Sequence, residues 1–293
     1  MNLKPFLYVA TLAACTAAQA QVDITIDAKN LGPKISPTHY GIFFEDINHA
    51  ADGGLYAELI QNRSFEDDDH VPVHWKAVHN QRSHASIELT AEDPMNGAHQ
   101  QSLRVIVTKA GGNDMAGVSN EGYWGMNVVK GREYRLSFWA KSDKKYKGTL
   151  KALIRTDGMI SNLGEVDIPV RLTAKWQKYT ATIKATGNDP KAVLDLITRT
   201  PGVFQLDVVS LFPPTFKDRE NGMRPDLAHM LADMHPKFMR FPGGCFVEGQ
   251  ISPENAFRWE RTIGPIEERP GHKNVNWGYR TTDGIGFHEY LQL

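Results

Sequence analysis

The sequence has little cysteine and almost no net charge, and each shortage excludes a class of protein. Its 293 residues include two cysteines, Cys15 and Cys245, and carry a formal net charge of −1. Two cysteines cannot form a disulfide framework or a cysteine-rich metal site. A nucleic-acid-binding domain would carry a basic excess, so this balance argues against nucleic acid as a partner. Burial of apolar side chains must therefore stabilise the fold, and a chain of this length allows it.

Long apolar runs are also absent, and the run nearest the N-terminus is short. A lysine precedes the mostly apolar residues 5–14, and residues 18–20 (Ala-Gln-Ala) match a small-residue cleavage site. Because the run is too short for a permanent membrane span, we predict a signal peptide over residues 1–20 and export to the periplasm or beyond. Residues 12–15 also resemble a lipoprotein box, so anchoring through Cys15 is the alternative. Cleavage there would leave a rather short signal.

Residues 21–66 are predicted to contain an N-terminal strand and one strand–loop–helix unit. Residues 22–26 alternate like an edge strand, and residues 40–44 form an apolar run typical of a strand buried on both faces. Two glycines then lead into a helix predicted to extend to residue 60. Between strand and helix lies a dense polar cluster, formed by Glu45, Asp46, Asn48 and His49.

Residues 67–212 are predicted to form an inserted β-sandwich of the jelly-roll type. Short alternating runs separated by turn residues are typical of that architecture. The predicted strands are 102–107, 123–129, 133–142, 149–155, 178–184, 193–198 and 204–211. The acidic residues 67–69 are interpreted as a solvated link, since no calcium-loop spacing follows them.

From residue 213 onward, helix and strand patterns alternate again. Pro225 suits a first helical turn, and apolar residues recur with helical spacing from Leu227 to Met234. Residues 238–241 predict a short strand, which the following proline ends because proline has no N–H to donate. A further helix is predicted from Asp283. Two such units cannot bury both faces of a parallel sheet, so we expect the sequence to be incomplete.

Several blocks of sequence are specific enough to indicate a family. They are residues 39–49 (HYGIFFEDINH), 53–66 (GGLYAELIQNRSFE), 240–249 (RFPGGCFVEG), 259–265 (WERTIGP), 269–271 (RPG) and 282–290 (TDGIGFHEY). In this order they resemble the α-L-arabinofuranosidases of glycoside hydrolase family 51. The resemblance covers about residues 35–66 and 213–293. It implies the N-terminal part of a (β/α)8 barrel, interrupted by a β-sandwich that resembles a carbohydrate-binding module.

The resemblance implies a retaining hydrolase that releases terminal α-L-arabinofuranosyl residues from arabinose-containing polysaccharides. Retention requires two carboxylates about 5 Å apart. In the family both lie at the ends of later barrel strands, and the acid/base belongs to an Asn-Glu pair. Here Asn120-Glu121 lies inside the predicted sandwich and Glu254-Asn255 is reversed. We therefore expect no catalytic residue in this chain, which would be inactive by itself.

Four residues are candidates for sugar contacts. Glu45 matches a family glutamate that binds arabinose hydroxyls, with a surface ion pair as the alternative. Arg240 matches an arginine of the same pocket, and a partly buried structural arginine is its alternative. Cys245 lies in the same motif, where a small buried apolar residue is the alternative. Trp139 is a candidate for sugar stacking because its strand face is otherwise polar, although tryptophans more often pack inside a sandwich.

The expected partner is an arabinose-containing polysaccharide or oligosaccharide, and the resemblance also points to homo-oligomers. No cofactor or metal is predicted, because His39 and His49 lack zinc-ligand spacing. A non-catalytic carbohydrate-binding protein that uses the sandwich is the alternative function. A sandwich that only positions the barrel is a third possibility. Which polysaccharide is attacked stays open.

Overall fold

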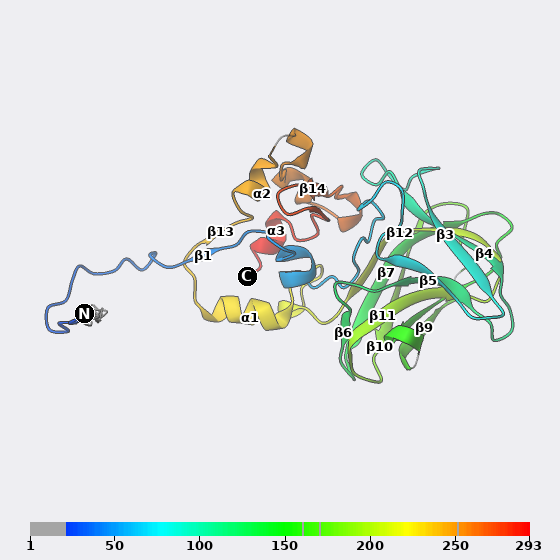
Figure 1. Cartoon of the computed structure of the whole chain (residues 1–293), viewed down its shortest axis with the longest axis horizontal. Helices are drawn as coiled ribbons and strands as arrows, with labels where there is room; N and C mark the ends of the chain where they lie inside the picture. Colours follow the sequence, from blue (N-terminus) through cyan, green and yellow to red (C-terminus); the bar gives the residue numbers. More distant parts are fainter. Residues whose placement is uncertain (1–21, 160, 170, 251) are drawn as a thin grey trace, which may run out of the picture. The chain divides into compact units, whose positions relative to one another are not determined.

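The computed structural model describes residues 22–159, 161–169, 171–250 and 252–293, and it divides into two units at residue 39 (Figure 1). The predicted signal peptide and Cys15 lie outside these residues. Residues 22–39 form turns and contain no strand, so the prediction of an edge strand over residues 22–26 is wrong. The alternating apolar side chains of Val22, Ile24 and Ile26 are exposed. No helix in the described ranges is long and apolar enough to cross a membrane.

The second unit contains a β-sandwich of two antiparallel sheets. One sheet has the order β10-β7-β12-β4-β3, and the other has the order β2-β5-β11-β8-β9 with β6 paired to β11. The first sheet consists of β3 His84–Thr90, β4 Ser102–Lys109, β7 Glu133–Ser142, β10 Gln177–Lys184 and β12 Gly202–Phe212. The second consists of β2 Trp75–His79, β5 Ala116–Asn120, β6 Met126–Val128, β8 Leu150–Arg155, β9 Asn162–Ile168 and β11 Asp189–Thr198. The expected all-β architecture is thus present.

Alternation of apolar and polar residues builds the sandwich core. In β7, Tyr134, Leu136, Phe138 and Ala140 are all buried, while the residues between them face outward. The rings of Phe138 and Tyr179 stack with centroids 5.5 Å apart. Burying one such aromatic or aliphatic side chain contributes about 1.5–3 kcal/mol, so this shared core stabilises both sheets.

The remaining elements are short. A two-residue strand β1 (Ile42–Phe43) pairs in parallel with β13 (Met239–Arg240), and β14 (His272–Asn274) forms a hairpin with β15 (Tyr279–Thr281) (Figure 1). The α-helices are α1 Pro225–Asp233, α2 Cys245–Glu248 and α3 Phe287–Tyr290. Further helical turns are η1 Ala51–Leu55, η2 Asp157–Met159, η3 Phe216–Asp218, η4 Pro253–Asn255, η5 Trp259–Thr262 and η6 Ile266–Glu268. The predicted helix from Pro225 is confirmed, and the strand predicted at residues 238–241 is present as the two residues of β13. The helix predicted from Asp283 begins only at Phe287, because Asp283 has a φ of 52° that a helix cannot contain.

Two predictions for residues 40–60 are wrong. Among the described residues the strand pairs with β13 alone, and Phe43 is 54% exposed, so the strand is not buried on both faces. The predicted helix is only the turn η1, because Gly53 has a φ of 86° and Asp52 a ψ of 118°. The chain beyond the turn is held in extended form by bonds to distant segments. The backbone N–H of Ala57 donates to the carbonyl of Gly222 at 3.1 Å.

The chain enters and leaves the sandwich along adjacent paths. The backbone N–H of Leu59 donates to the carbonyl of Leu211 at 3.1 Å, and that of Val209 donates to the carbonyl of Arg63 at 2.9 Å. The buried carboxylate of Glu58 joins the two paths, since it accepts hydrogen bonds from the Ser210 hydroxyl and the Leu211 N–H at 2.5 and 2.9 Å. The side chain of Glu58 thus connects the segment that enters the sandwich with the segment that leaves it.

A second, smaller apolar cluster lies outside the sandwich. It comprises Ala51, Leu55, Tyr56, Ala57, Phe212, Phe216, Met223, Ala228, Ile285 and Tyr290. Phe212 is the last residue of β12, and its ring lies 5.4 Å from that of Tyr56. The end of a sandwich strand therefore forms part of this second core.

Candidate functional site

The parallel pairing of β1 with β13 brings two polar loops to one end of the strands. Ile42 pairs with Met239 and Phe43 pairs with Arg240. Since the strands run in the same direction, the residues that follow each strand leave at the same edge. Glu45 follows β1, and the glycine-rich loop to Cys245 follows β13. Segments 200 residues apart in sequence thus meet where chemistry gathers in α/β folds.

Glu45 is held against the glycine-rich loop. Its Oε1 accepts a hydrogen bond from the backbone N–H of Phe246 at 3.4 Å. Gly243 has a φ of 125°, and a Cβ at that position would lie 2.1 Å from Cγ of Glu45. A side chain at position 243 would therefore displace the carboxylate. Glu45 itself is half-buried, which leaves acceptor capacity for a ligand.

Arg240 is exposed and packs over an aromatic ring. Its Cζ lies 4.4 Å from the centroid of Phe43, the residue opposite it in the strand pair. Within the described residues no carboxylate lies within ion-pair distance of its guanidinium. The alternative of a partly buried structural arginine is therefore wrong. The cation–π contact orients the guanidinium while leaving its donors available.

Cys245 is exposed, so the alternative of a small buried apolar residue is also wrong. It begins the four-residue helix α2, whose buried residue is Phe246 instead. The carbonyl of Cys245 accepts a hydrogen bond from Nδ2 of Asn276 at 2.8 Å, which fixes the start of this helix. Glu45 and Cys245 are brought together through Phe246, which follows the cysteine and binds the carboxylate.

A fully buried carboxylate, Asp46, lies directly after Glu45. Its Oδ1 accepts hydrogen bonds from the Ala51 N–H at 2.9 Å and the Tyr279 hydroxyl at 3.0 Å. Nδ2 of Asn274 donates to its carbonyl at 3.1 Å. Burial, followed by the charge of Asp52, raises the pKa of Asp46 to about 7. These bonds tie the loop after β1 to the β14–β15 hairpin.

Two more buried acids support the same hairpin. Asp52 accepts hydrogen bonds from the backbone N–H and the hydroxyl of Thr282 at 2.6 and 2.9 Å, and burial raises its pKa. Asp283 lies 3.0 Å from Nδ1 of His272. Because these acids are buried and bonded within the protein, they position the loops and do not face a ligand.

The sequence predicts a polar cluster around Asp46 but neither its burial nor its contacts with the hairpin. Nothing in the sequence indicates that a hairpin more than 225 residues later lies against this loop. Buried hydrogen bonds between distant segments leave no local periodic signal.

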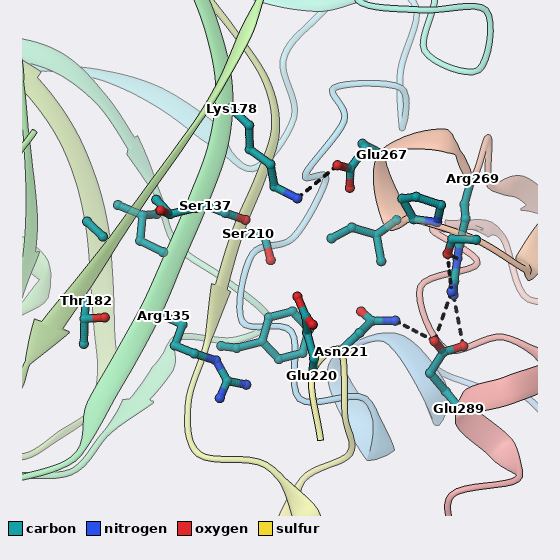
Figure 2. Close-up of a pocket in the computed structure, with 17 residues that line it drawn as sticks. Arg135, Ser137, Lys178, Thr182, Ser210, Glu220, Asn221, Glu267, Arg269 and Glu289 are labelled. Atoms are coloured by element: carbon teal, nitrogen blue, oxygen red, sulfur yellow. Dashed lines mark hydrogen bonds and ion pairs between the residues drawn. The ribbon is translucent and has the colours of Figure 1, made fainter. Parts of the chain in front are cut away.

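Trp139, the predicted stacking residue, is half-buried on the outer face of β7. It pairs with Lys178 of β10 and Asp207 of β12, and its indole Nε1 is buried without a partner in the described residues. A pocket of about 750 Å³ lies against the same sheet (Figure 2). Trp139 is not among the residues that line it, so a stacking role stays a prediction.

The pocket of Figure 2 lies between the sheet and the chain that leads to α3. Figure 2 shows Lys178 directed toward Glu267 across it, with Nζ and Oε1 3.0 Å apart. On its other side Arg269 binds Glu289 through two nitrogens, each 3.0 Å from a carboxylate oxygen. The lining is mostly polar, with Phe212 as its aromatic residue. Within the described ranges no cluster of three or more acids, histidines or cysteines could hold a metal ion.

Two family models match the chain. A model described as alpha-L-arabinofuranosidase 1 domain matches residues 230–293, and one described as carbohydrate binding domain matches residues 57–202. The first covers the glycine-rich loop and the β14–β15 hairpin. The second covers ten of the eleven sandwich strands and part of β12.

Similar proteins carry corresponding names. Alpha-L-arabinofuranosidase 1 of Arabidopsis thaliana is 39% identical over 93% of this chain and 41% of its own length. The extracellular exo-alpha-L-arabinofuranosidase of Streptomyces chartreusis is 35% identical over 97% of this chain and 34% of its own length. An arabinose-bound MgGH51 α-L-arabinofuranosidase structure matches 86% of this chain and 41% of its own, with a TM-score of 0.79 and 34% identity. The predicted resemblance is confirmed, and the chain spans about two-fifths of these relatives' length.

Proposed function

We propose that this chain, which is homologous over most of its length to the α-L-arabinofuranosidases of glycoside hydrolase family 51, supplies the sugar-holding part of such an enzyme. The enzyme would release terminal α-L-arabinofuranosyl residues from arabinose-containing polysaccharides. The observation that carries the proposal is the meeting of Glu45 with the loop of residues 243–246. That contact joins two of the sequence blocks on which the family resemblance rests.

The chemistry of the three candidate residues suits a furanose ring. The Glu45 carboxylate can accept hydrogen bonds from neighbouring hydroxyls, and Arg240 can donate to a ring or hydroxyl oxygen. Cys245 is exposed beside them and adds a polarisable surface at the start of α2. In this assignment Asp46 and Tyr279 position Glu45 without contacting sugar.

For the fold, we propose that residues 21–66 and 213–293 are parts of one (β/α)8 barrel. The parallel pairing of β1 with β13 supports this, because it joins segments that precede and follow the sandwich. The inserted module would span residues 67–212. Residues 1–20 would direct export, in agreement with the extracellular Streptomyces relative.

We also propose that the two carboxylates of a retaining mechanism do not lie among the described residues. Such carboxylates must face the substrate about 5 Å apart. Asp46, Asp52 and Asp283 are buried and bonded to the protein. The Asn120-Glu121 pair lies at the end of a sandwich strand, where Asn120 donates to the carbonyl of Gln61 at 2.9 Å.

The test compares sugar binding with turnover in the 293-residue chain. We expect no hydrolysis of 4-nitrophenyl α-L-arabinofuranoside. We expect L-arabinose binding in a saturation-transfer NMR experiment, weakened about tenfold by Glu45→Gln, a loss of about 1.4 kcal/mol. Glu88→Gln, on the exposed part of β3, is the matched control. Hydrolysis that Glu45→Ala abolishes would refute the proposal that the catalytic carboxylates lie outside the described residues. Absence of arabinose binding would refute the proposed sugar site.

A second candidate function is carbohydrate binding by the sandwich without catalysis. The match of residues 57–202 to a carbohydrate binding domain and the pocket of Figure 2 favour it. Arg135 and Glu220 line that pocket, and their side chains have no hydrogen-bond or ion-pair partner in the described residues. Affinity electrophoresis in arabinoxylan gels tests it. Retardation that Arg135→Ala abolishes and Glu45→Gln leaves intact would favour this second function.

A further inference from the structure

An exposed tryptophan projects from the connection between β5 and β6. The indole of Trp124 is 70% exposed, in contrast to Trp75, which is buried in the sandwich core. Its backbone has a φ of 57°, which bulky residues rarely adopt. The strained backbone and the exposed apolar ring each reduce the stability of the fold. Such backbone outliers cluster at ligand-binding sites.

The loop that carries Trp124 is held on both sides. A Cβ at Gly125 would lie 2.6 Å from Cα of Lys191 in β11, so the loop lies directly on that strand. The neighbouring residue Tyr123 packs against Gly53 of η1, where a Cβ would lie 2.6 Å from its ring. Tyr123 therefore anchors the loop, and Trp124 is presented outward from a fixed backbone. A preorganised surface of this kind loses little entropy on binding.

A pocket of about 350 Å³ lies beside the exposed indole. Its lining includes His49 and Gln61 from the chain before the sandwich, and His74, Glu121, Trp124, Asp157 and Lys191 from the sandwich. The combination is one flat aromatic face with amide, imidazole, ammonium and carboxylate groups around it. Such a lining suits a polyhydroxylated ligand, whose apolar ring face packs on the indole while its hydroxyls bind the polar groups.

Contacts link this pocket to the proposed arabinose site. The ring of His49 lies edge-on to Trp124 at 5.5 Å and stacks on Tyr279 at 3.9 Å. The hydroxyl of Tyr279 accepts a hydrogen bond from the His49 N–H at 3.0 Å and binds Asp46, the residue after Glu45. His49 follows Glu45 by four residues, so their Cα atoms lie within about 15 Å of each other. Because His49 also lines the pocket, an oligosaccharide can extend from Glu45 into it.

We propose that the Trp124 pocket is a saccharide subsite for the polymer chain that bears the terminal arabinofuranose. This inference rests on the proposed function, which places the arabinose at Glu45. The subsite takes a neutral pentose chain, and Trp124 stacks on one of its sugar rings. The sandwich then contributes to substrate selection through the loop that carries Trp124. This role requires neither Trp139 nor the pocket of Figure 2.

Affinity electrophoresis of the 293-residue chain tests the subsite. We expect retardation by a pentose polymer, an approximately tenfold weaker association for Trp124→Ala, and substantial recovery for Trp124→Phe, which keeps a flat ring. Trp259→Ala is the matched control, because Trp259 is also exposed but lies outside the pocket. Circular dichroism verifies the fold of each variant. Equal retardation of Trp124→Ala and the wild type, or no retardation of the wild type, would overturn the proposal.

Two further arms separate the possible outcomes. Arabinoxylan and linear arabinan are used in parallel, and selective retardation by either one identifies the source of the pentose chain. L-Arabinose binding by NMR should be unchanged in Trp124→Ala. If the wild type does not bind L-arabinose but its retardation depends on Trp124, the assignment of Glu45 is refuted and the subsite is supported. The reverse result would refute the subsite alone.

Discussion

At the scale of single residues, Gly243 is required both by its backbone and by its neighbour. We expect Gly243→Ala to destabilise the chain by about 1–3 kcal/mol, because alanine strains a backbone with a φ of 125°. Its Cβ would also displace the carboxylate of Glu45, so arabinose binding should fall. Gly131→Ala is the control, since Gly131 has a φ of 85° but no atom near its Cβ. Thermal unfolding and NMR titration measure the two effects, and equal arabinose binding in both variants would contradict the clash.

The buried carboxyl of Asp46 predicts a pH dependence of stability. Its pKa is about 7 in the folded chain, against an ordinary value of 3.8, because burial and then Asp52 disfavour its charged form. Between these values the folded state binds more protons than the unfolded state, so this contribution to stability is lost as pH rises toward 7. From pH 5 to 8 the wild type should lose roughly 2–3 kcal/mol more than Asp46→Asn does.

Urea unfolding of both proteins at the two pH values measures this difference. Asparagine keeps the acceptor used by the Ala51 N–H and the Tyr279 hydroxyl, so the comparison isolates the proton. Buried acids that do not interact with Asp46, such as Glu58, are present in both proteins and cancel. Parallel pH profiles would show that Asp46 does not titrate in this range.

The sequence identifies a functional residue when that residue lies inside a recognisable local motif. Glu45, Arg240 and Cys245 lie inside recognisable blocks, so their candidacy came from local motifs, and the structure places them near one end of the β1–β13 pair. Their sugar contacts stay predictions. The contacts on which the proposed role of Trp124 and the burial of Asp46 rest are made by loops from distant parts of the chain, which no motif records.

At the scale of elements, Arg269 fastens the segments around α3. It donates to the carbonyls of Gly264 and Gly284 and binds both carboxylate oxygens of Glu289 at 3.0 Å. Burial raises the pKa of Glu289, but the hydrogen bonds and charge of Arg269 outweigh it, and the pKa is lowered overall. One buried guanidinium thus satisfies backbone groups that such short elements leave open.

We expect Arg269→Lys to destabilise the chain by about 3 kcal/mol or more, because an ammonium cannot reproduce the fork and leaves buried acceptors unpaired. Lys178→Met provides the comparison, since it removes a partly exposed ion pair with Glu267 and should cost less than about 1 kcal/mol. Denaturant unfolding measures both changes. Similar losses for the two variants would show that burial of the Arg269 pair adds nothing.

Element prediction succeeded where periodicity was strong and failed where it was short. The alternation in β7 and the spacing of α1 are visible in sequence, and both elements were found. Strands β2, β3, β5 and β9 were missed because interruptions and small residues weaken their alternation. The predicted helix ending at residue 60 failed because Leu59 and Ile60 pack on the sandwich core in extended form.

At the scale of the whole described chain, the two apolar cores differ greatly in extent. The sandwich core draws on strands of both sheets, whereas the buried residues of the second cluster come from short helices, helical turns and connecting segments, together with Phe212 at the end of β12. We therefore expect amide hydrogens in β7 and β12 to exchange at least tenfold more slowly than those in α1 and α3. Mass spectrometry of deuterium uptake measures this. Uniform protection would indicate a single cooperative unit.

The adjacent entry and exit of the sandwich have a consequence for how such a chain can evolve. Residues 59–63 and 209–211 are hydrogen-bonded neighbours, so the module between them begins and ends at nearly one point. A gene segment encoding it can be gained, lost or exchanged without altering the spacing of the flanking parts. The carboxylate of Glu58, which precedes the module, accepts hydrogen bonds from Ser210 and Leu211 at the module's end. An ancestral or engineered variant without the sandwich would have to supply new donors for this carboxylate.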